Sequence, residues 1–320
     1  MDPKDLAKAV INGDRRALAK AITLVEGTTK QQKEQAVALL DLILPQTGNS
    51  IRIGISGIPG VGKSTFIESF GLQLACKDNL AVLTVDPSSE TGRGAILGDK
   101  TRMVNLSRLT NVFIRPSPSG LASGGVALRT REAILLCEAA GFKTIFVETV
   151  GVGQSESMVR SMVDIFILLQ IPRAGDELQG IKRGILELVD IICVTKADGD
   201  NLKAAQKCQI EMESSLGLLR GAEKWIPPVL LISSTERTGL DNLEKTIKQF
   251  KNSHASLFEK NRKDQAEAWF DQELSSLISA KISQDPHLKK LVEEGRHATR
   301  NQLKAAPKEA LKIINKLFKD

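Results

Sequence analysis

The chain has 320 residues and a formal net charge of +6; 42% of its residues are hydrophobic and 26% are charged. These proportions are typical of a globular protein that folds in water. There is no run of about 18 apolar residues, so we expect no membrane span. Tyrosine is absent and aromatic residues make up only 4%. Side chains that stack on bases are therefore scarce, and we expect no nucleic-acid partner.

The start of the chain lacks the charged-then-apolar layout of a secretory signal, so we expect a cytoplasmic protein. The cysteines form no CxxC pair, and their spacing suits neither a zinc site nor a disulfide framework. They are Cys76, Cys137, Cys193 and Cys208. We expect all four to be free thiols.

Residues 1–45 have apolar side chains at helical spacing, which predicts a helical N-terminal extension. The sequence Asn12-Gly13-Asp14 interrupts this pattern. Asp14 is a candidate N-cap for the helix that follows. Turn-forming residues at positions 45–49 end the segment.

From residue 51 onward, short apolar runs alternate with longer helical stretches. The runs cover residues 51–56, 80–85, 112–114, 144–147, 165–169, 191–194 and 229–232. Strands separated by helices need crossover connections, which predicts an α/β fold with a mostly parallel central sheet and helices on both faces. Ligands of such folds bind at the carboxyl ends of the strands.

Strand signals stop after about residue 250. Residues 264–282 follow a helical pattern that Pro286 ends, and a last amphipathic helix begins near Pro307. We therefore divide the chain into an N-terminal extension (1–45), a sheet domain (46–250) and a C-terminal helical arm (251–320). The arm has apolar faces that need a partner surface. That surface is either the sheet domain or a second copy of the chain, and on the second alternative we expect the arm to form a homodimer.

Residues 57–64 match the phosphate-loop pattern G-x-x-x-x-G-K-[ST], between a predicted strand and a predicted helix. Backbone N–H groups of such a loop surround phosphate oxygens, and the helix N-terminus adds partial positive charge. We expect Lys63 to bridge the β- and γ-phosphates and Ser64 to ligate Mg²⁺. The candidate phosphate-binding residues are Gly57, Pro59, Gly60, Val61, Gly62, Lys63, Ser64 and Thr65.

Three acidic residues stand where a nucleotide-bound Mg²⁺ takes further oxygen ligands. Asp86 ends a predicted strand, and Asp99 lies in the long loop beyond it. Glu148 ends another strand and begins Glu-Thr-Val-Gly, which has the form of the DxxG switch of GTPases with Glu in place of Asp. We expect each of the three carboxylates to face the phosphates.

Residues 195–198 read Thr-Lys-Ala-Asp and follow a predicted strand. The Asp198 carboxylate can accept hydrogen bonds from N1–H and the exocyclic amine of guanine, a donor pair that adenine lacks. Lys196 can cover the base and support the phosphate loop. This predicts GTP and GDP as ligands. Base-site candidates are Thr195, Lys196, Asp198, Ser233 and Ser234, the last two following the final strand.

The chain resembles the MeaB/ArgK family of P-loop GTPases over roughly residues 45–245. The matching stretches are GIPGVGKST, VDPSSETGRGAILGDKTRM, IRPSPSGLASGGVA, VETVGVGQSE and AGDELQGIKRGILELVD. The resemblance implies a homodimeric GTPase that gates adenosylcobalamin loading of an acyl-CoA mutase, of the methylmalonyl-CoA mutase type, and protects that mutase from inactivation.

The resemblance also implies roles for individual residues. It puts Asp86, Asp99 and Glu148 at the Mg²⁺ site, residues 174–184 in a third switch, and Lys182 in a role that assists hydrolysis. The chain departs from the family pattern in three places. Arg173 stands where we expect Gly, Ser234 replaces Ala, and Thr195 replaces Asn.

Hydrolysis of GTP needs an oriented water and a neutralised γ-phosphate. Many GTPases place Gln directly after DxxG, but this chain has Val152 there, whose side chain cannot orient water. We hypothesise that intrinsic hydrolysis is slow. Gln154, Asp99 or Lys182 would complete the site when a partner or the dimer closes it.

Two other classes of function remain open. A metallochaperone GTPase for a nickel enzyme needs thiolate or imidazole ligands; this chain has only His254, His287 and His297, and no paired cysteines. A targeting GTPase would dock through basic helices such as the lysine-rich residues 308–319. Such a charge run is more typical of a solvated helix face.

Overall fold

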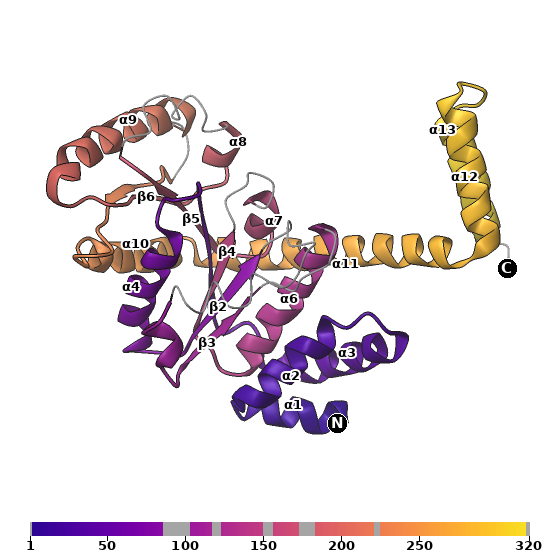
Figure 1. The fold of residues 1–320 in the computed structure, drawn as a ribbon, viewed down its shortest axis with the longest axis horizontal. Helices are drawn as coiled ribbons and strands as arrows, with labels where there is room; N and C mark the ends of the chain where they lie inside the picture. The colour runs from indigo at the N-terminus through magenta and orange to yellow at the C-terminus, as the bar shows by residue number, and fades with distance from the viewer. Residues whose placement is uncertain are drawn as a thin grey trace. The chain divides into compact units, whose positions relative to one another are not determined.

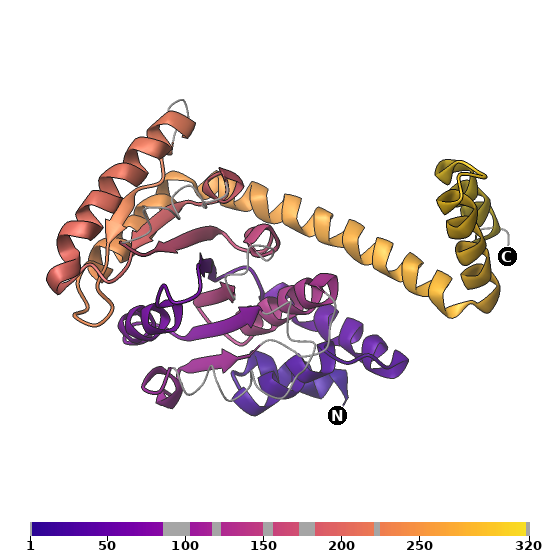
Figure 2. The same cartoon turned by 45° about the horizontal axis from the view of Figure 1, so that its top comes forward.

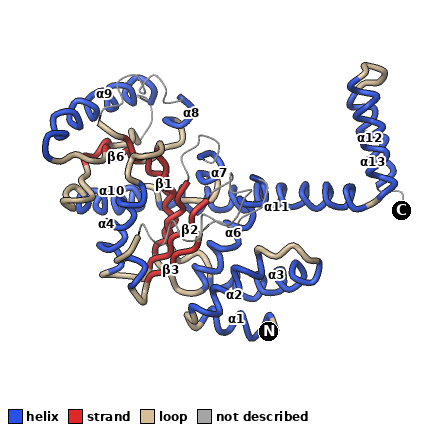
Figure 3. Tube along the Cα trace, viewed as in Figure 1, coloured by secondary structure: helices blue, strands red, loops and turns tan. Residues whose placement is uncertain are grey.

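The computed structural model describes residues 2–85, 103–116, 123–149, 156–172, 183–220 and 225–317. Its centre is a seven-stranded sheet in the order β3-β2-β4-β1-β5-β6-β7, with every neighbouring pair parallel (Figures 1 and 3). The strands are β1 (Ile51–Gly57), β2 (Leu80–Val85), β3 (Val112–Arg115), β4 (Thr144–Thr149), β5 (Ile165–Gln170), β6 (Ile191–Val194) and β7 (Val229–Leu231). The predicted α/β fold is confirmed, and each of the seven apolar runs forms a strand.

Helices cover both faces of the sheet. One face packs against α4 (Lys63–Ala75), η2 (Leu106–Arg108) and α10 (Leu240–Ser253). The other packs against α6 (Ser123–Ala139), α7 (Glu156–Arg160), α8 (Arg183–Leu186) and α9 (Leu202–Arg220). A short helix, η3 (Gly199–Asn201), precedes α9.

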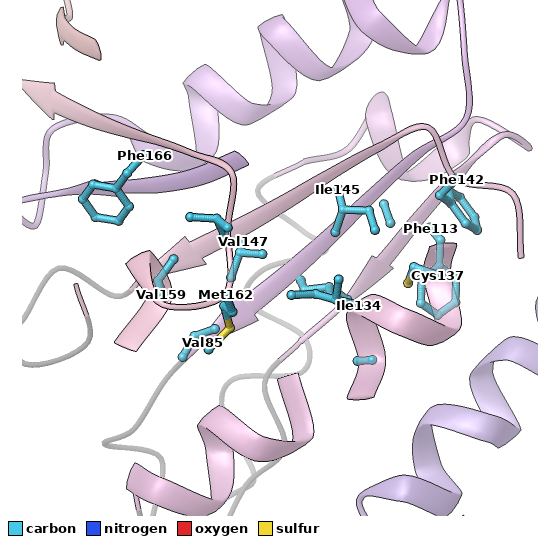
Figure 4. Packing of buried hydrophobic residues seen from close by; sticks show 14 of the residues in the cluster. Val85, Phe113, Ile134, Cys137, Phe142, Ile145, Val147, Val159, Met162 and Phe166 are labelled. Atoms are coloured by element: carbon cyan, nitrogen blue, oxygen red, sulfur yellow. The ribbon is translucent and has the colours of Figure 1, made fainter. Parts of the chain in front are cut away.

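Side chains of each strand alternate between the two cores, as the period of a β-strand requires. In β4, Phe146 belongs to the α4 side, whereas Ile145 and Val147 belong to the α6 side. Figure 4 shows Ile145 and Val147 with Ile134 of α6 and Val159 of α7. Both faces of the strands are therefore buried, which explains why the strands read as continuous apolar runs.

The N-terminal extension is helical, as predicted, and consists of α1 (Pro3–Ile11), α2 (Arg15–Val25), α3 (Lys30–Ile43) and η1 (Leu44–Gln46). Its buried residues join the same core as α6, and Figures 1 and 2 show the three helices next to α6. Asp14 caps α2, because its carboxylate accepts the N–H groups of Arg16 and Ala17.

The chain divides into two compact units, Met1–Arg262 and Lys263–Asp320. The helix α11 (Ala255–Gln284) runs from the first into the second, which also holds α12 (Pro286–Arg300) and α13 (Ala306–Leu317). In the second unit α12 and α13 pack together. Among the described residues, no helix is both long and apolar enough to cross a membrane. The three-part division made from the sequence stays a prediction.

Candidate nucleotide site

The phosphate loop connects β1 to α4 at the carboxyl end of the sheet. Gly62 is the N-cap of α4, with φ of 94°. This left-handed conformation favours glycine over every residue that carries a Cβ. Within the loop, Val61 is buried and Ser64 is half-buried, whereas Pro59, Gly60 and the following Thr65 are exposed. The loop thus presents backbone and hydroxyl groups at the start of a helix.

Lys63 lies within this loop and contacts its backbone. Its Nζ donates hydrogen bonds to the carbonyl oxygens of Gly57, over 2.6 Å, and Ile58, over 3.2 Å. Burial lowers the pKa of Lys63, while the negative charges of Glu148 and Glu156 act in the opposite direction. Two carboxylates therefore act on the ammonium group from the neighbouring strand β4 and helix α7.

Glu148 lies on β4 at the carboxyl end of the sheet and is buried. It pairs in register with Ile55 of β1 and with Thr84 of β2. The structure therefore brings this predicted metal ligand next to the strand that leads into the phosphate loop.

Three buried residues to which the sequence analysis gave no role form a hydrogen-bonded chain that includes Ser56, the residue before the phosphate loop. The Thr149 hydroxyl donates to Ser56 Oγ over 2.8 Å, and Ser56 Oγ–H donates to Glu156 Oε1 over 3.3 Å. Ser56 and Thr149 are fully buried and Glu156 is 7% exposed. The signal that could have found Glu156 is a carboxylate in the stretch just after the Glu-Thr-Val-Gly motif.

The Thr-Lys-Ala-Asp motif follows β6 and meets the phosphate loop directly. The Thr195 hydroxyl lies 2.8 Å from the carbonyl oxygen of Val61 and 3.1 Å from that of Gln170. Lys196 has φ of 55°, and its Nζ donates to the carbonyl oxygen of Gly60 over 3.1 Å. Two segments more than 130 residues apart in the sequence are thus joined by hydrogen bonds.

The loop after β7 contacts Asp198, the last residue of this motif. Asp198 Oδ2 accepts hydrogen bonds from the hydroxyl of Ser233 and, over 3.1 Å, from that of Thr235. The carbonyl oxygen of Ser234 accepts the hydroxyl of Ser69 from α4, over 2.6 Å. The structure therefore brings the predicted base-site residues together, and it adds a contact of Thr235 with Asp198 that the sequence analysis did not expect.

Four predicted site residues lie outside the described part of the chain: Asp86, Asp99, Gln154 and Lys182. The departure at Arg173 lies there as well. Within the described residues, no group of three or more His, Cys, Asp or Glu side chains could hold a metal ion.

The phosphate loop follows the first strand of a parallel sheet and is hydrogen-bonded to the Thr-Lys-Ala-Asp motif at the same carboxyl end of the sheet. This arrangement defines a P-loop nucleotide-binding protein. The model of one family, described as methylmalonyl-CoA mutase-associated GTPase MeaB, matches residues 18–287. The chain belongs to this family of GTPases, which confirms the resemblance seen in the sequence.

Individual relatives agree with this assignment. A probable GTPase of Mycobacterium tuberculosis is 47% identical over 90% of this chain and 87% of its own length. GTPase ArgK of Escherichia coli is 48% identical over 75% of this chain and 73% of its own. The crystal structure of a LAO/AO transport system kinase is similar to this fold with a TM-score of 0.78 and 34% identity, covering 98% of this chain and 97% of that one.

Proposed function

We propose that the protein is a slow GTPase that gates adenosylcobalamin loading of an acyl-CoA mutase of the methylmalonyl-CoA mutase type and protects that mutase. The GTPase part is carried by one observation: the base-selecting motif and the phosphate loop are joined by the bonds from Thr195 to Val61 and from Lys196 to Gly60. The mutase part is supported by the description of the family as mutase-associated. A mouse relative named methylmalonic aciduria type A homolog, 48% identical over 77% of this chain and 62% of its own length, adds support.

Each described site residue has a role in this proposal. Backbone N–H groups between Gly57 and Thr65 bind the phosphates, and Lys63 neutralises the β- and γ-phosphate oxygens. Asp198, held by Ser233, accepts the two guanine donors. Thr195 and Lys196 hold the Thr-Lys-Ala-Asp segment against the phosphate loop. The distance between the base and phosphate subsites is therefore fixed before the nucleotide binds.

The guanine assignment has a direct test. Asn in place of Asp198 presents an amide donor, which suits the 2-oxo group of xanthine instead of the 2-amino group of guanine. We expect Asp198→Asn to lose affinity for GDP and gain affinity for xanthosine diphosphate, measured by calorimetry. Ser234→Ala, which restores the residue we expected there, is the control and should keep the preference for GDP. A wild-type protein that binds ADP as well as GDP would refute the assignment.

Mg²⁺ fits the residues at the phosphate end of the site. Ser64 opens α4, Glu148 is buried beside β1, and hydroxyl and carboxylate oxygens are the ligands that Mg²⁺ prefers. We propose that these two residues, with Asp86 and Asp99, hold the ion or its waters. Once bound, the ion would neutralise phosphate charge. We expect Glu148→Gln to raise the Mg²⁺ concentration needed for half-maximal hydrolysis, with little change in GDP affinity measured without Mg²⁺.

We also propose that hydrolysis is slow until a partner completes the site, through Gln154, Asp99 or Lys182. Single-turnover hydrolysis by the isolated protein and by the protein with its partner should differ strongly. Lys182→Ala should reduce the stimulated rate and leave the basal rate nearly unchanged. A fast basal rate that Lys182→Ala does not alter would contradict this.

The partner and the homodimer are tested on the full chain. Tagged protein loaded with GDP or with a non-hydrolysable GTP analogue should retain an acyl-CoA mutase subunit in a nucleotide-dependent way, identified by mass spectrometry. Light scattering after gel filtration should give twice the chain mass of 34.8 kDa. Recovery of only ribosomal, membrane or nickel-enzyme partners would leave the GTPase intact and overturn the mutase assignment.

A further inference from the structure

Thr235 lies next to the carboxylate that reads the base. Its hydroxyl donates to Asp198 Oδ2 over 3.1 Å, and the hydroxyl of Ser233 donates to the same oxygen. Two hydroxyl donors from one loop therefore converge on Oδ2, and neither of them bonds to Oδ1.

The two donors are held very differently. Ser233 is fully buried, its Oγ accepts the N–H of Glu236 over 3.1 Å, and its backbone exchanges two hydrogen bonds with Thr238. Thr235 is exposed, and its Oγ1 lies 3.1 Å from Ser233 Oγ. Ser233 is thus a fixed part of the loop, whereas the Thr235 side chain can turn away from Asp198 at little cost.

The number of lone pairs limits what Oδ2 can accept. A carboxylate has about four acceptor positions, two on each oxygen. The hydroxyls of Ser233 and Thr235 take both positions on Oδ2. Guanine presents N1–H and an exocyclic N–H side by side, so reading both requires one position on each oxygen. One guanine donor must therefore displace a hydroxyl from Oδ2.

We propose that Thr235 is a specificity-determining residue, which competes with guanine for Oδ2 of Asp198 and yields when the base docks. This rests on the proposed guanine site. Hypoxanthine keeps N1–H but lacks the 2-amino group. Its single donor can bond to Oδ1, so neither hydroxyl on Oδ2 has to be displaced. The competition consequently lowers affinity for guanine nucleotides and narrows their advantage over inosine nucleotides.

Thr235→Val tests the competition, because valine has nearly the shape of threonine without the donor. Kd values for GDP and inosine diphosphate are measured by calorimetry at one Mg²⁺ concentration. We expect Thr235→Val to bind GDP about three- to tenfold more tightly, which corresponds to the net worth of one hydrogen bond relative to water. Binding of inosine diphosphate should change by less than about twofold, the smaller effect expected when no bond is exchanged.

Thr235→Ser keeps the hydroxyl and is the matched control, expected to behave like the wild type. Unchanged or weaker GDP binding by Thr235→Val would overturn the competition and assign Thr235 a supporting role for the carboxylate. A wild type that does not prefer GDP over ADP would instead overturn the guanine site itself, and the competition with it. Because Thr235 is exposed, the melting temperature of Thr235→Val should match the wild type.

Discussion

Arg262 and Asp164 form a bidentate ion pair at the amino end of the sheet. Arg262 Nε donates to Asp164 Oδ1 and its Nη2 to Oδ2, both over 2.7 Å. Asp164 also accepts the N–H of Arg52 from β1, over 2.8 Å, and its side chain is only 2% exposed. The guanidinium further binds the carbonyl oxygens of Gly48 and Ser50. Arg262 of α11 is thus joined to the amino end of the sheet, which is the end opposite the nucleotide site.

We expect Arg262→Ala to lower the free energy of unfolding by about 3–5 kcal/mol, because it leaves the buried Asp164 carboxylate without its counter-ion. Arg262→Lys should recover only part of this loss, since an ammonium group cannot form the two parallel bonds. Urea denaturation measures both changes.

Lys207→Ala is the control for Arg262→Ala, because the ion pair of Lys207 with Glu211 is exposed and spans 3.7 Å. Removal of such a pair costs at most about 1 kcal/mol. Equal losses for the two alanine variants would contradict the structural role of Arg262.

Glu244 of α10 predicts a dependence of stability on pH. It accepts hydrogen bonds from Lys248, Lys77 and Gln73, the last two from the α4 side. Burial raises the pKa of Glu244, but these bonds outweigh it and lower the pKa from 4.5 to about 2. Because the folded-state pKa is depressed, the stabilisation is present above pH 4.5 and is lost as the pH falls toward 2.

Glu244→Gln removes the titrating group and tests this dependence. We expect the difference in unfolding free energy between wild type and variant to be constant at neutral pH and to shrink between pH 4.5 and about 2. Chemical denaturation at a series of pH values measures it. A difference that is the same at pH 3 and at pH 7 would show that the ionised carboxylate contributes nothing.

The strands and the phosphate loop could be predicted because their signals are local. A fully buried parallel strand is a continuous apolar run, and the phosphate loop needs particular residues at fixed spacing. The C-terminal helices were harder. The sequence analysis missed α12, where Pro286 begins a new helix behind the N-cap Asp285 instead of only ending the previous one. It also began the preceding helix at residue 264, whereas α11 starts at Ala255.

The contact of Lys196 with the phosphate loop could be predicted from its motif, but contacts that no motif links could not. Ser56 and Glu156 are 100 residues apart and meet only because β1 and α7 lie side by side in the fold. The hydroxyl of Thr235 reaches Asp198 because the loop after β7 folds back through the paired residues Ser233 and Thr238. Such positions depend on the register of the whole sheet.

The hydroxyl of Thr195 connects the Thr-Lys-Ala-Asp motif to the phosphate loop, and removing this hydroxyl tests the connection. Thr195 is 3% exposed. Thr195→Val keeps the shape and leaves the Val61 carbonyl without this partner, which should cost about 1–3 kcal/mol of stability. Affinity for GDP should fall with it, because the two loops are then less firmly held together. Thr195→Ser keeps the hydroxyl and should stay within about 1 kcal/mol of the wild type; an equal loss would show that packing, not the hydrogen bond, is responsible.

Gly239 precedes α10 in a left-handed conformation, with φ of 80°, and a Cβ there would lie 2.1 Å from the carbonyl oxygen of Leu231. Gly141 has a similar φ of 86°, but a Cβ there would meet nothing within 4 Å.

Both alanine variants place a residue with a Cβ in the left-handed region, which costs about 1–2 kcal/mol. Only Gly239→Ala must also push β7 away from α10. We therefore expect this variant to lose more than about 4 kcal/mol of unfolding free energy, a loss as large as steric clashes in a packed core produce. Because the loop that holds Ser233 and Ser234 follows Leu231, GDP affinity should fall in Gly239→Ala and stay unchanged in Gly141→Ala. Equal losses of stability in the two variants would mean that backbone strain alone, and not the close approach to Leu231, requires glycine at this position.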